Sequence, residues 1–129
     1  MTIPFESKEH QQFFYRCLKK ANNMDEYHQG LFYTMGISEV TRDTLSQWFD
    51  FENDGIKTEC LEAYWQTGSS SRLTRLAFNL WNGYQDERTN PYDMFDCSYG
   101  KYMLTAIRLR YPEYCLMLEK PQIVENWER

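Results

Sequence analysis

The sequence has no long apolar run and no recognisable leader segment. No stretch of about 18 residues is continuously apolar, so no segment has the length and character of a membrane span. The N-terminal segment MTIPFESKEHQQ lacks the basic region and the apolar region that follow one another in a secretory signal peptide. These two absences predict a protein that resides in the cytoplasm.

Cysteine is present, but it is not arranged for a disulfide framework or a local metal site. The four cysteines, Cys17, Cys60, Cys97 and Cys115, are widely spaced and form no CxxC pair. In the cytoplasm such residues remain reduced thiols, and most of them act as small core residues. We therefore expect no disulfide bond.

Positive charge is also scarce, since 14 Lys and Arg residues face 19 Asp and Glu residues and the net charge is −5. This balance argues against a general nucleic-acid binder, which needs Lys and Arg to neutralise phosphates. Between Glu39 and Glu62, seven acidic and two basic residues give a local net charge of −5. This acidic segment is either a solvated face or a surface for a basic protein partner. Its candidate partner-binding residues are Asp50, Glu52, Asp54, Glu59 and Glu62.

Aromatic residues and helical periodicity are abundant. Phe, Trp and Tyr make up 17% of the 129 residues, which favours a packed core over disorder. Apolar residues recur at spacings of three and four, whereas the alternation typical of strands is hard to find. We predict an all-α fold, a single compact domain of six to seven short helices over residues 1–118, followed by a C-terminal tail over residues 119–129.

Capping and turn residues predict where the helices begin and end. Ser7, Asp25 and Ser38 are expected to cap the first three helices, and Gly36 is expected to stop the second. The NDG sequence at 53–55 indicates a turn. The remaining helices are predicted over residues 57–66, from Ser70 or Ser71 to Gly83, from Pro91 behind the cap Asn90, and over residues 98–111. The predicted core includes Trp48, Trp65, Leu76, Leu80 and Trp81.

The segment GSSS at 68–71 is the one stretch that invites comparison with a phosphate-binding loop. It lies between two predicted helices, and it lacks the second glycine and the lysine of a P-loop. An anion could still bind the helix start beside Arg72 and Arg75, but a plain helix cap is the favoured interpretation. In that interpretation Gly68 ends the fourth helix.

Arg72, Arg75 and Asn79 lie on the polar face of the fifth predicted helix. Two interpretations are open for these residues. They either bond the carbonyl groups of other parts of the chain or belong to the partner-binding surface. We favour internal bonding and keep the second interpretation as a candidate.

A zinc site and a catalytic pair are the chemical alternatives. Asp25 and His28 are three residues apart on one helix and face the same side, so they could bind zinc together with Cys60 or Cys17. Cys17 and His28 would also lie at similar heights in a helical hairpin. No family signature accompanies either arrangement. We expect a histidine hydrogen-bonded beside a helix cap, no catalytic residues, and no cofactor other than a possible zinc ion.

Three segments together resemble a known family: DEYHQGLFYTMGISEVTRD, IKTECLEAYWQTGSSSRLTRLAFNLWNG and LRYPEYC. They are similar to the domain-of-unknown-function family number 6075 of Gram-positive bacteria, their phages and their conjugative elements. The resemblance covers residues 7 to about 115 and is most specific between Trp65 and Trp81. The family has no established activity, so the resemblance implies no catalytic residues. It implies a setting among small accessory proteins of mobile elements, many of which block host defences, including CRISPR nucleases.

This setting and the acidic segment together give the leading hypothesis. Inhibitors of RNA-guided nucleases are often small and acidic, and they dock on basic channels that otherwise hold nucleic acid. We expect a non-enzymatic, anti-CRISPR type of binding protein in the host cytoplasm, with a basic protein partner such as a Cas9-type effector and no direct contact with nucleic acid or membrane. The alternatives are a helical regulatory or interaction module of a mobile element and a small protein with structural zinc.

Overall fold

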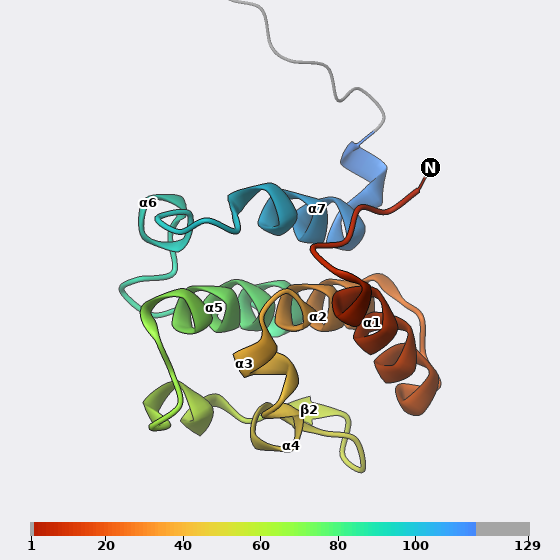
Figure 1. The fold of residues 1–129 in the computed structure, drawn as a ribbon, viewed down its shortest axis with the longest axis horizontal. Coiled ribbons are helices and arrows are strands. Elements are labelled where there is room, and N and C mark those ends of the chain that lie inside the picture. The colour runs from red at the N-terminus through yellow and green to blue at the C-terminus, as the bar shows by residue number, and fades with distance from the viewer. Residues whose placement is uncertain (1, 116–129) are drawn as a thin grey trace, which may run out of the picture.

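The computed structural model describes residues 2–115, and this part of the chain is built almost entirely from helices (Figure 1). It contains seven α-helices, two short 3-10 helices and one hairpin of two-residue strands. The prediction of an all-α fold with six to seven helices is therefore confirmed. The predicted boundary between the helical domain and the tail over residues 119–129 lies outside the described residues.

The elements follow one another with short connections. In chain order they are α1 (Lys8–Ala21), α2 (Glu26–Gly36), α3 (Glu39–Arg42), α4 (Leu45–Trp48), β1 (Phe49–Asp50), β2 (Gly55–Ile56), η1 (Thr58–Glu62), α5 (Gly68–Asn82), α6 (Pro91–Met94), α7 (Gly100–Arg110) and η2 (Pro112–Tyr114). The two strands are antiparallel, and Phe49 pairs with Ile56. The caps predicted at Ser7, Asp25, Ser38 and Asn90 are all confirmed by side-chain hydrogen bonds.

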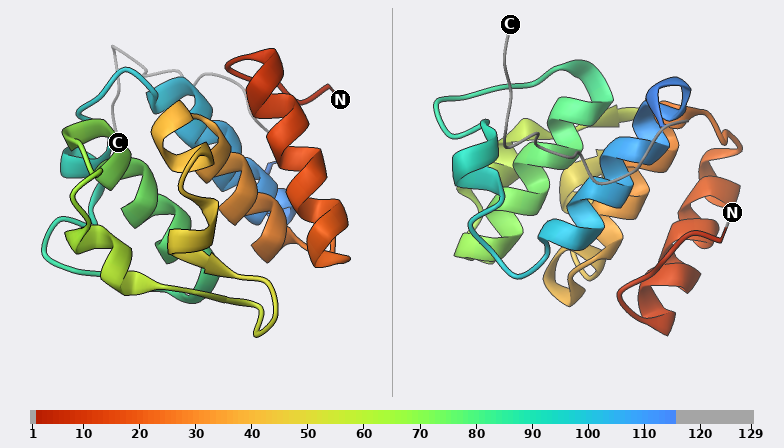
Figure 2. Two further views of the ribbon diagram at one scale, coloured as in Figure 1. Left: turned by 60° about the horizontal axis from the view of Figure 1, so that its bottom comes forward. Right: turned by 90° about the horizontal axis from the view of Figure 1, so that it is seen from above.

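Helix α2 is the centre of the fold. It packs against α5, α7 and α1, and the views in Figure 2 place it between α1 and α5, with α7 along another of its sides. The short elements α3, α4 and the hairpin lie on the side away from α7 (Figure 1). Residues Gly30 to Gly36 are all buried. A helix that is covered on every side needs apolar residues all around it, and the sequence GLFYTMG supplies them.

The end of α2 corrects the prediction that Gly36 acts as a left-handed stop. Gly36 is the last helical residue, and Gly83 is the glycine with positive φ among the described residues. A side chain at position 36 would still be excluded, because its Cβ would lie 2.7 Å from His10 Cδ2. Gly36 therefore serves the close approach of α1 to α2, and not a turn.

Side chains satisfy the carbonyl groups at this end of α2 in place of a glycine turn. The His10 ring donates from Nε2 to the carbonyl oxygen of Tyr33 over 2.8 Å. The Thr41 hydroxyl and the Arg42 guanidinium donate to the carbonyl oxygens of Met35 and Gly36. Unpaired carbonyl groups at a buried helix end are costly, so these three bonds allow α2 to end inside the protein.

The third and fourth predicted helices are wrong in extent. The segment after Ser38 divides into α3 and α4, and Trp48 donates its indole N–H back to the carbonyl oxygen of Thr41 over 2.7 Å. The fourth predicted helix, over residues 57–66, is reduced to η1. Ala63 is extended, and Tyr64 is 95% exposed.

The start of α5 also differs from the prediction. Thr67 is the N-cap: its hydroxyl accepts the N–H of Ser70 over 3.1 Å, and the Ser70 hydroxyl accepts the N–H of Thr67 over 2.7 Å. This reciprocal pair is a capping box. Gly68 is therefore the first residue of α5 and ends no earlier helix, while Gly83 ends α5 with φ 80° as predicted.

The predicted core is confirmed at three positions and corrected at two. Trp48, Leu76 and Leu80 are buried, whereas Trp65 and Trp81 are partly exposed and pack against the edge of the core.

No helix within residues 2–115 is long and apolar enough to cross a membrane.

Candidate functional site

The five acidic residues predicted to bind a partner lie on the hairpin and on η1. Both elements are on the side of α2 away from α7 (Figure 1). Glu52 and Asp54 are exposed in the turn between β1 and β2, Asp50 is partly exposed, and Glu59 and Glu62 are exposed on η1. Within residues 2–115, Asp50, Glu52, Glu59 and Glu62 form no ion pair with a basic side chain. Their negative charge is therefore open to solvent.

Residues 51–54, which we call the hairpin tip, have a defined conformation. The Asp50 carboxylate accepts hydrogen bonds from the N–H groups of Glu52 and Asn53 and from the Asn53 side chain, over 3.0, 3.2 and 2.7 Å. These bonds lower the pKa of Asp50. Asp54 closes the turn with φ 52°, a left-handed conformation that Asp tolerates better than most residues. Asp50 thus builds the turn, while Glu52 points its charge into solvent without a partner among the described residues.

Asp54 reaches from the hairpin tip to His28, which is 2% exposed in the first turn of α2. His28 Nε2 lies 2.8 Å from Asp54 Oδ1, and His28 Nδ1 lies 2.7 Å from Asp25 Oδ1. Asp25 Oδ1 also accepts the backbone N–H of His28 as the helix cap. An ionised carboxylate only accepts hydrogen bonds, so both ring nitrogens must carry a proton and the ring must be an imidazolium ion.

The electrostatics of this cluster agree with its geometry. Burial lowers the pKa of His28, but the hydrogen bonds and charges of Asp25 and Asp54 outweigh burial and raise it above 6.5. Burial raises the pKa of Asp25, and its bonds to His28 outweigh that and lower it. The cluster is thus an ion triad between α2 and the hairpin tip.

The predicted zinc ligands do not assemble. His28 and Asp25 meet, but the second ring nitrogen of His28 faces Asp54 and not Cys60. In the part of the chain that the structure describes, no group of three or more His, Cys, Asp and Glu side chains is placed to hold a metal ion. Burial raises the pKa of the Cys60 thiol to about 12, so it stays protonated.

The catalytic pair considered from the sequence does not form either. Both ring nitrogens of His28 are taken by carboxylates. Cys17 is 1% exposed, and burial raises the pKa of its thiol to about 12. A thiol that is neither ionised nor beside a base is not an activated nucleophile.

The polar face of α5 is bonded inside the protein. Arg72 donates from Nε to the carbonyl oxygen of Asp93 over 2.8 Å, and Arg75 Nε bonds both carboxylate oxygens of Asp86 over 3.1 and 2.9 Å. Asn79 donates to the carbonyl oxygen of Tyr84. These contacts agree with the favoured interpretation of internal bonding. They hold α6 and the loop that precedes it against α5.

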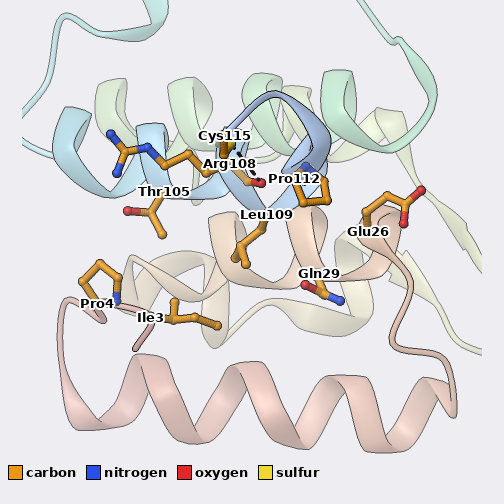
Figure 3. Close-up of a pocket in the computed structure, with 9 residues that line it drawn as sticks. All are labelled: Ile3, Pro4, Glu26, Gln29, Thr105, Arg108, Leu109, Pro112 and Cys115. Carbon is orange, nitrogen blue, oxygen red and sulfur yellow. Dashed lines mark hydrogen bonds between the residues drawn. The ribbon is translucent and has the colours of Figure 1, made fainter. Parts of the chain in front are cut away.

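A groove of about 510 Å³ lies on the other side of the molecule, between the N-terminal segment, α2 and α7 (Figure 3). Ile3 and Pro4 form one wall, Leu109 lines the α7 side, and Glu26 and Gln29 of α2 lie at one end. Sequence reasoning missed this groove because its walls come from segments far apart in the chain. The Cys115 thiol, which also lines the groove, donates to the carbonyl oxygen of Tyr111 over 3.2 Å.

The fold and the site define a small helical protein with a structured acidic hairpin, in which residues 2–115 contain no group of side chains placed to hold a metal ion. The chain belongs to the family of unknown function DUF6075, whose model matches residues 1–123. The sequence resemblance to this family is therefore confirmed. The chain matches no curated protein and no solved structure.

Proposed function

We propose that this protein is a non-enzymatic binding protein of a mobile genetic element that acts in the cytoplasm of the host cell. Its partner is a protein with a basic, nucleic-acid-binding surface, most specifically a CRISPR–Cas effector of the Cas9 type. The observation that carries the proposal is the acidic hairpin and η1, where Glu52, Glu59 and Glu62 are exposed and unpaired among the described residues.

Two physical properties of this surface support binding to a basic partner. Unpaired carboxylates attract a positively charged surface during encounter and raise the association rate. The turn is already ordered by the Asp50 hydrogen bonds, so less conformational entropy is lost when the complex forms. The arginines of α5 are occupied by Asp93 and Asp86. We therefore assign the interface to the acidic residues first.

The test is binding of the full chain to purified Cas9-type effectors, measured by pull-down and by association kinetics at several salt concentrations. Exposed charges are screened beyond about 10 Å at 0.1 M salt, so association should slow as salt rises. The variant E52Q/E59Q/E62Q should slow association by about tenfold. Asp50 stays unchanged in this variant because it builds the turn.

The matched control is E9Q/E87Q/E113Q, which removes the same charge from exposed positions outside the acidic segment. Asp86 is unsuitable as a control because it pairs with Arg75. The control should bind as the unmodified protein does. An effector that binds both variants equally would contradict the assignment of the interface. Absence of binding to every effector, with capture of a protein of the mobile element instead, would favour the alternative of a regulatory or interaction module.

A further inference from the structure

We propose that Asp25, His28 and Asp54 form a protonation-controlled latch that fixes the hairpin tip against α2. His28 is the positioning residue of this latch. The latch joins parts of the chain that are 26 residues apart, through the 2.8 Å contact between His28 Nε2 and Asp54 Oδ1. The other side-chain hydrogen bonds of the tip within the described residues run to Asp50 and stay inside the hairpin.

The latch closes only when His28 carries two ring protons. With one proton, one nitrogen would present a lone pair to a carboxylate oxygen, and that contact would become repulsive. The two sides of the latch are unequal. Asp25 is held by both the ring and the backbone N–H of His28, whereas the side chain of Asp54 is 54% exposed and stands at φ 52°. Loss of the proton therefore releases Asp54 and leaves the cap of α2 in place.

The carboxylates of Asp25 and Asp54 are the charged groups that raise the pKa of His28. From α5, the uncharged Trp81 ring meets the His28 ring edge-on with centroids 4.8 Å apart, and α2 itself contributes Phe32. From α1, Lys20 lies over the Phe51 ring of the hairpin tip, and the same ring stacks on Phe32 of α2. Within residues 2–115, Asp25 and Asp54 are the acidic groups within ion-pair distance of His28.

The sign of the pH dependence follows from these contacts. The pKa of His28 in the folded protein lies above its ordinary value of 6.5. The latch is therefore closed at pH 6.5 and opens as the pH rises through the raised pKa. This inference needs no partner, but its consequence for binding rests on the proposed function. The apparent affinity of the protein for its partner is proportional to the fraction of molecules in which the tip is latched, so it falls as the latch opens.

The test uses the full chain alone and follows the His28 ring by NMR across pH. The unmodified protein should titrate above 6.5. D54N should lower the midpoint by about one pH unit, because it removes one of two opposite charges. Asn keeps the left-handed conformation accessible, so this variant retains the turn. The matched control is E52Q, which removes one charge from the same tip without touching His28, and its midpoint should stay close to that of the unmodified protein.

Hydrogen-exchange protection of the amides at 52–54 provides the second readout. In the unmodified protein, protection should fall as His28 loses its proton. D54N and H28Q should show the low value at every pH, and E52Q should behave as the unmodified protein does. A His28 midpoint at or below 6.5, or tip protection that is constant across the titration, would overturn the latch.

These outcomes are independent of the proposed function. If the latch readouts appear as expected and E52Q/E59Q/E62Q binds effectors normally, the latch stands and the assigned interface fails. If the acidic variant loses binding while tip protection ignores the His28 titration, the interface stands and the latch fails.

Discussion

His10 and His28 occupy the same position in two helices, but the His10 ring is neutral and the His28 ring carries a positive charge. Each is three residues after its N-cap, Ser7 or Asp25, and each donates its backbone N–H to that cap. Each ring is buried, with 0% and 2% of the residue exposed. Position and burial are therefore matched, and the partners of the ring nitrogens make the difference.

His10 is held by backbone groups. Its Nδ1 accepts the N–H of Glu6 over 3.0 Å and its Nε2 donates to the carbonyl oxygen of Tyr33 over 2.8 Å, which defines a neutral ring. Burial lowers the pKa of His10 to about 4, and the bond to Tyr33 offsets only part of this effect. His28 has two carboxylate partners and stays charged. The comparison teaches that the hydrogen-bond partners, more than depth of burial, decide whether a buried histidine is an ion.

The largest expected effect comes from removing the polar atoms of His10. The variant H10F fills much of the same space but leaves the N–H of Glu6 and the carbonyl oxygen of Tyr33 without partners. We expect a loss of about 2–4 kcal/mol in the free energy of unfolding, because the unpaired carbonyl group of the buried Tyr33 costs about 1–3 kcal/mol and the N–H of the exposed Glu6 adds a smaller loss. Chemical denaturation measures this change. A loss below about 1 kcal/mol would mean that water replaces both bonds.

The next effect tests how tightly the His10 ring is enclosed. G36A places a Cβ 2.7 Å from His10 Cδ2 and 3.0 Å from Phe13 Cδ1, so it should cost about 1–3 kcal/mol. G55A is the control, since its Cβ has no neighbour closer than 3.9 Å, and it should change stability by no more than about 0.5 kcal/mol. Thermal unfolding of both variants gives the comparison. Equal melting temperatures would show that α1 moves away without cost.

The two histidines should also change the free energy of unfolding with pH in opposite directions. The pKa of His10 is lowered to about 4, so its contribution is complete above 6.5 and about 3 kcal/mol is lost as the pH falls to about 4. The pKa of His28 is raised, so its contribution is complete below 6.5 and is lost as the pH rises from 6.5 through the raised pKa. The free energy of unfolding should therefore be greatest near pH 6.5.

Denaturation at intervals between pH 5 and pH 8 checks this maximum. The other described groups with shifted pKa values have ordinary pKa values outside this pH range, for example 3.8 for Asp25 and 9.0 for Cys17. The maximum between pH 5 and pH 8 therefore reports on the two histidines. A curve that is flat over this range would contradict the charge states assigned to both rings.

The smallest effect isolates the charge of His28. H28Q keeps the Asp25 cap but removes the cation. The loss in its free energy of unfolding, relative to the unmodified protein, should therefore be about 1 kcal/mol larger at pH 6 than at pH 8.5. Urea denaturation at the two pH values measures this difference. A deficit independent of pH would indicate lost packing against Trp81 alone.

The starts of α1, α2 and α6 could be predicted because their signals are local. Ser7, Asp25 and Asn90 are followed by helical periodicity, and each cap hydrogen bond closes within three residues. The end of α2 could not be predicted, because the groups that satisfy its carbonyls come from α1 and α3. The segment over residues 57–66 has apolar residues at helical spacing, but it forms only the 3-10 helix η1, because the backbone turns extended at Ala63 before Thr67 caps α5.

The candidate site was predictable only in part. Asp25 and His28 are close in sequence, and their contact follows from helical spacing. The contact of His28 with Asp54 depends on the path of α3, α4 and the hairpin, which no periodicity reveals. The same dependence on the path of the chain explains why Cys60 does not join His28 and why Arg75 finds Asp86.

The central place of α2 has a consequence for how the protein is made. α2 is synthesised early, yet one of its sides is covered by α7, whose first residue follows the end of α2 by more than sixty positions. Until residues 100–110 have left the ribosome, that side of an apolar helix has no native cover, and contacts distant in sequence are slow to form. The growing chain therefore cannot complete the packing of α2 until α7 has been synthesised.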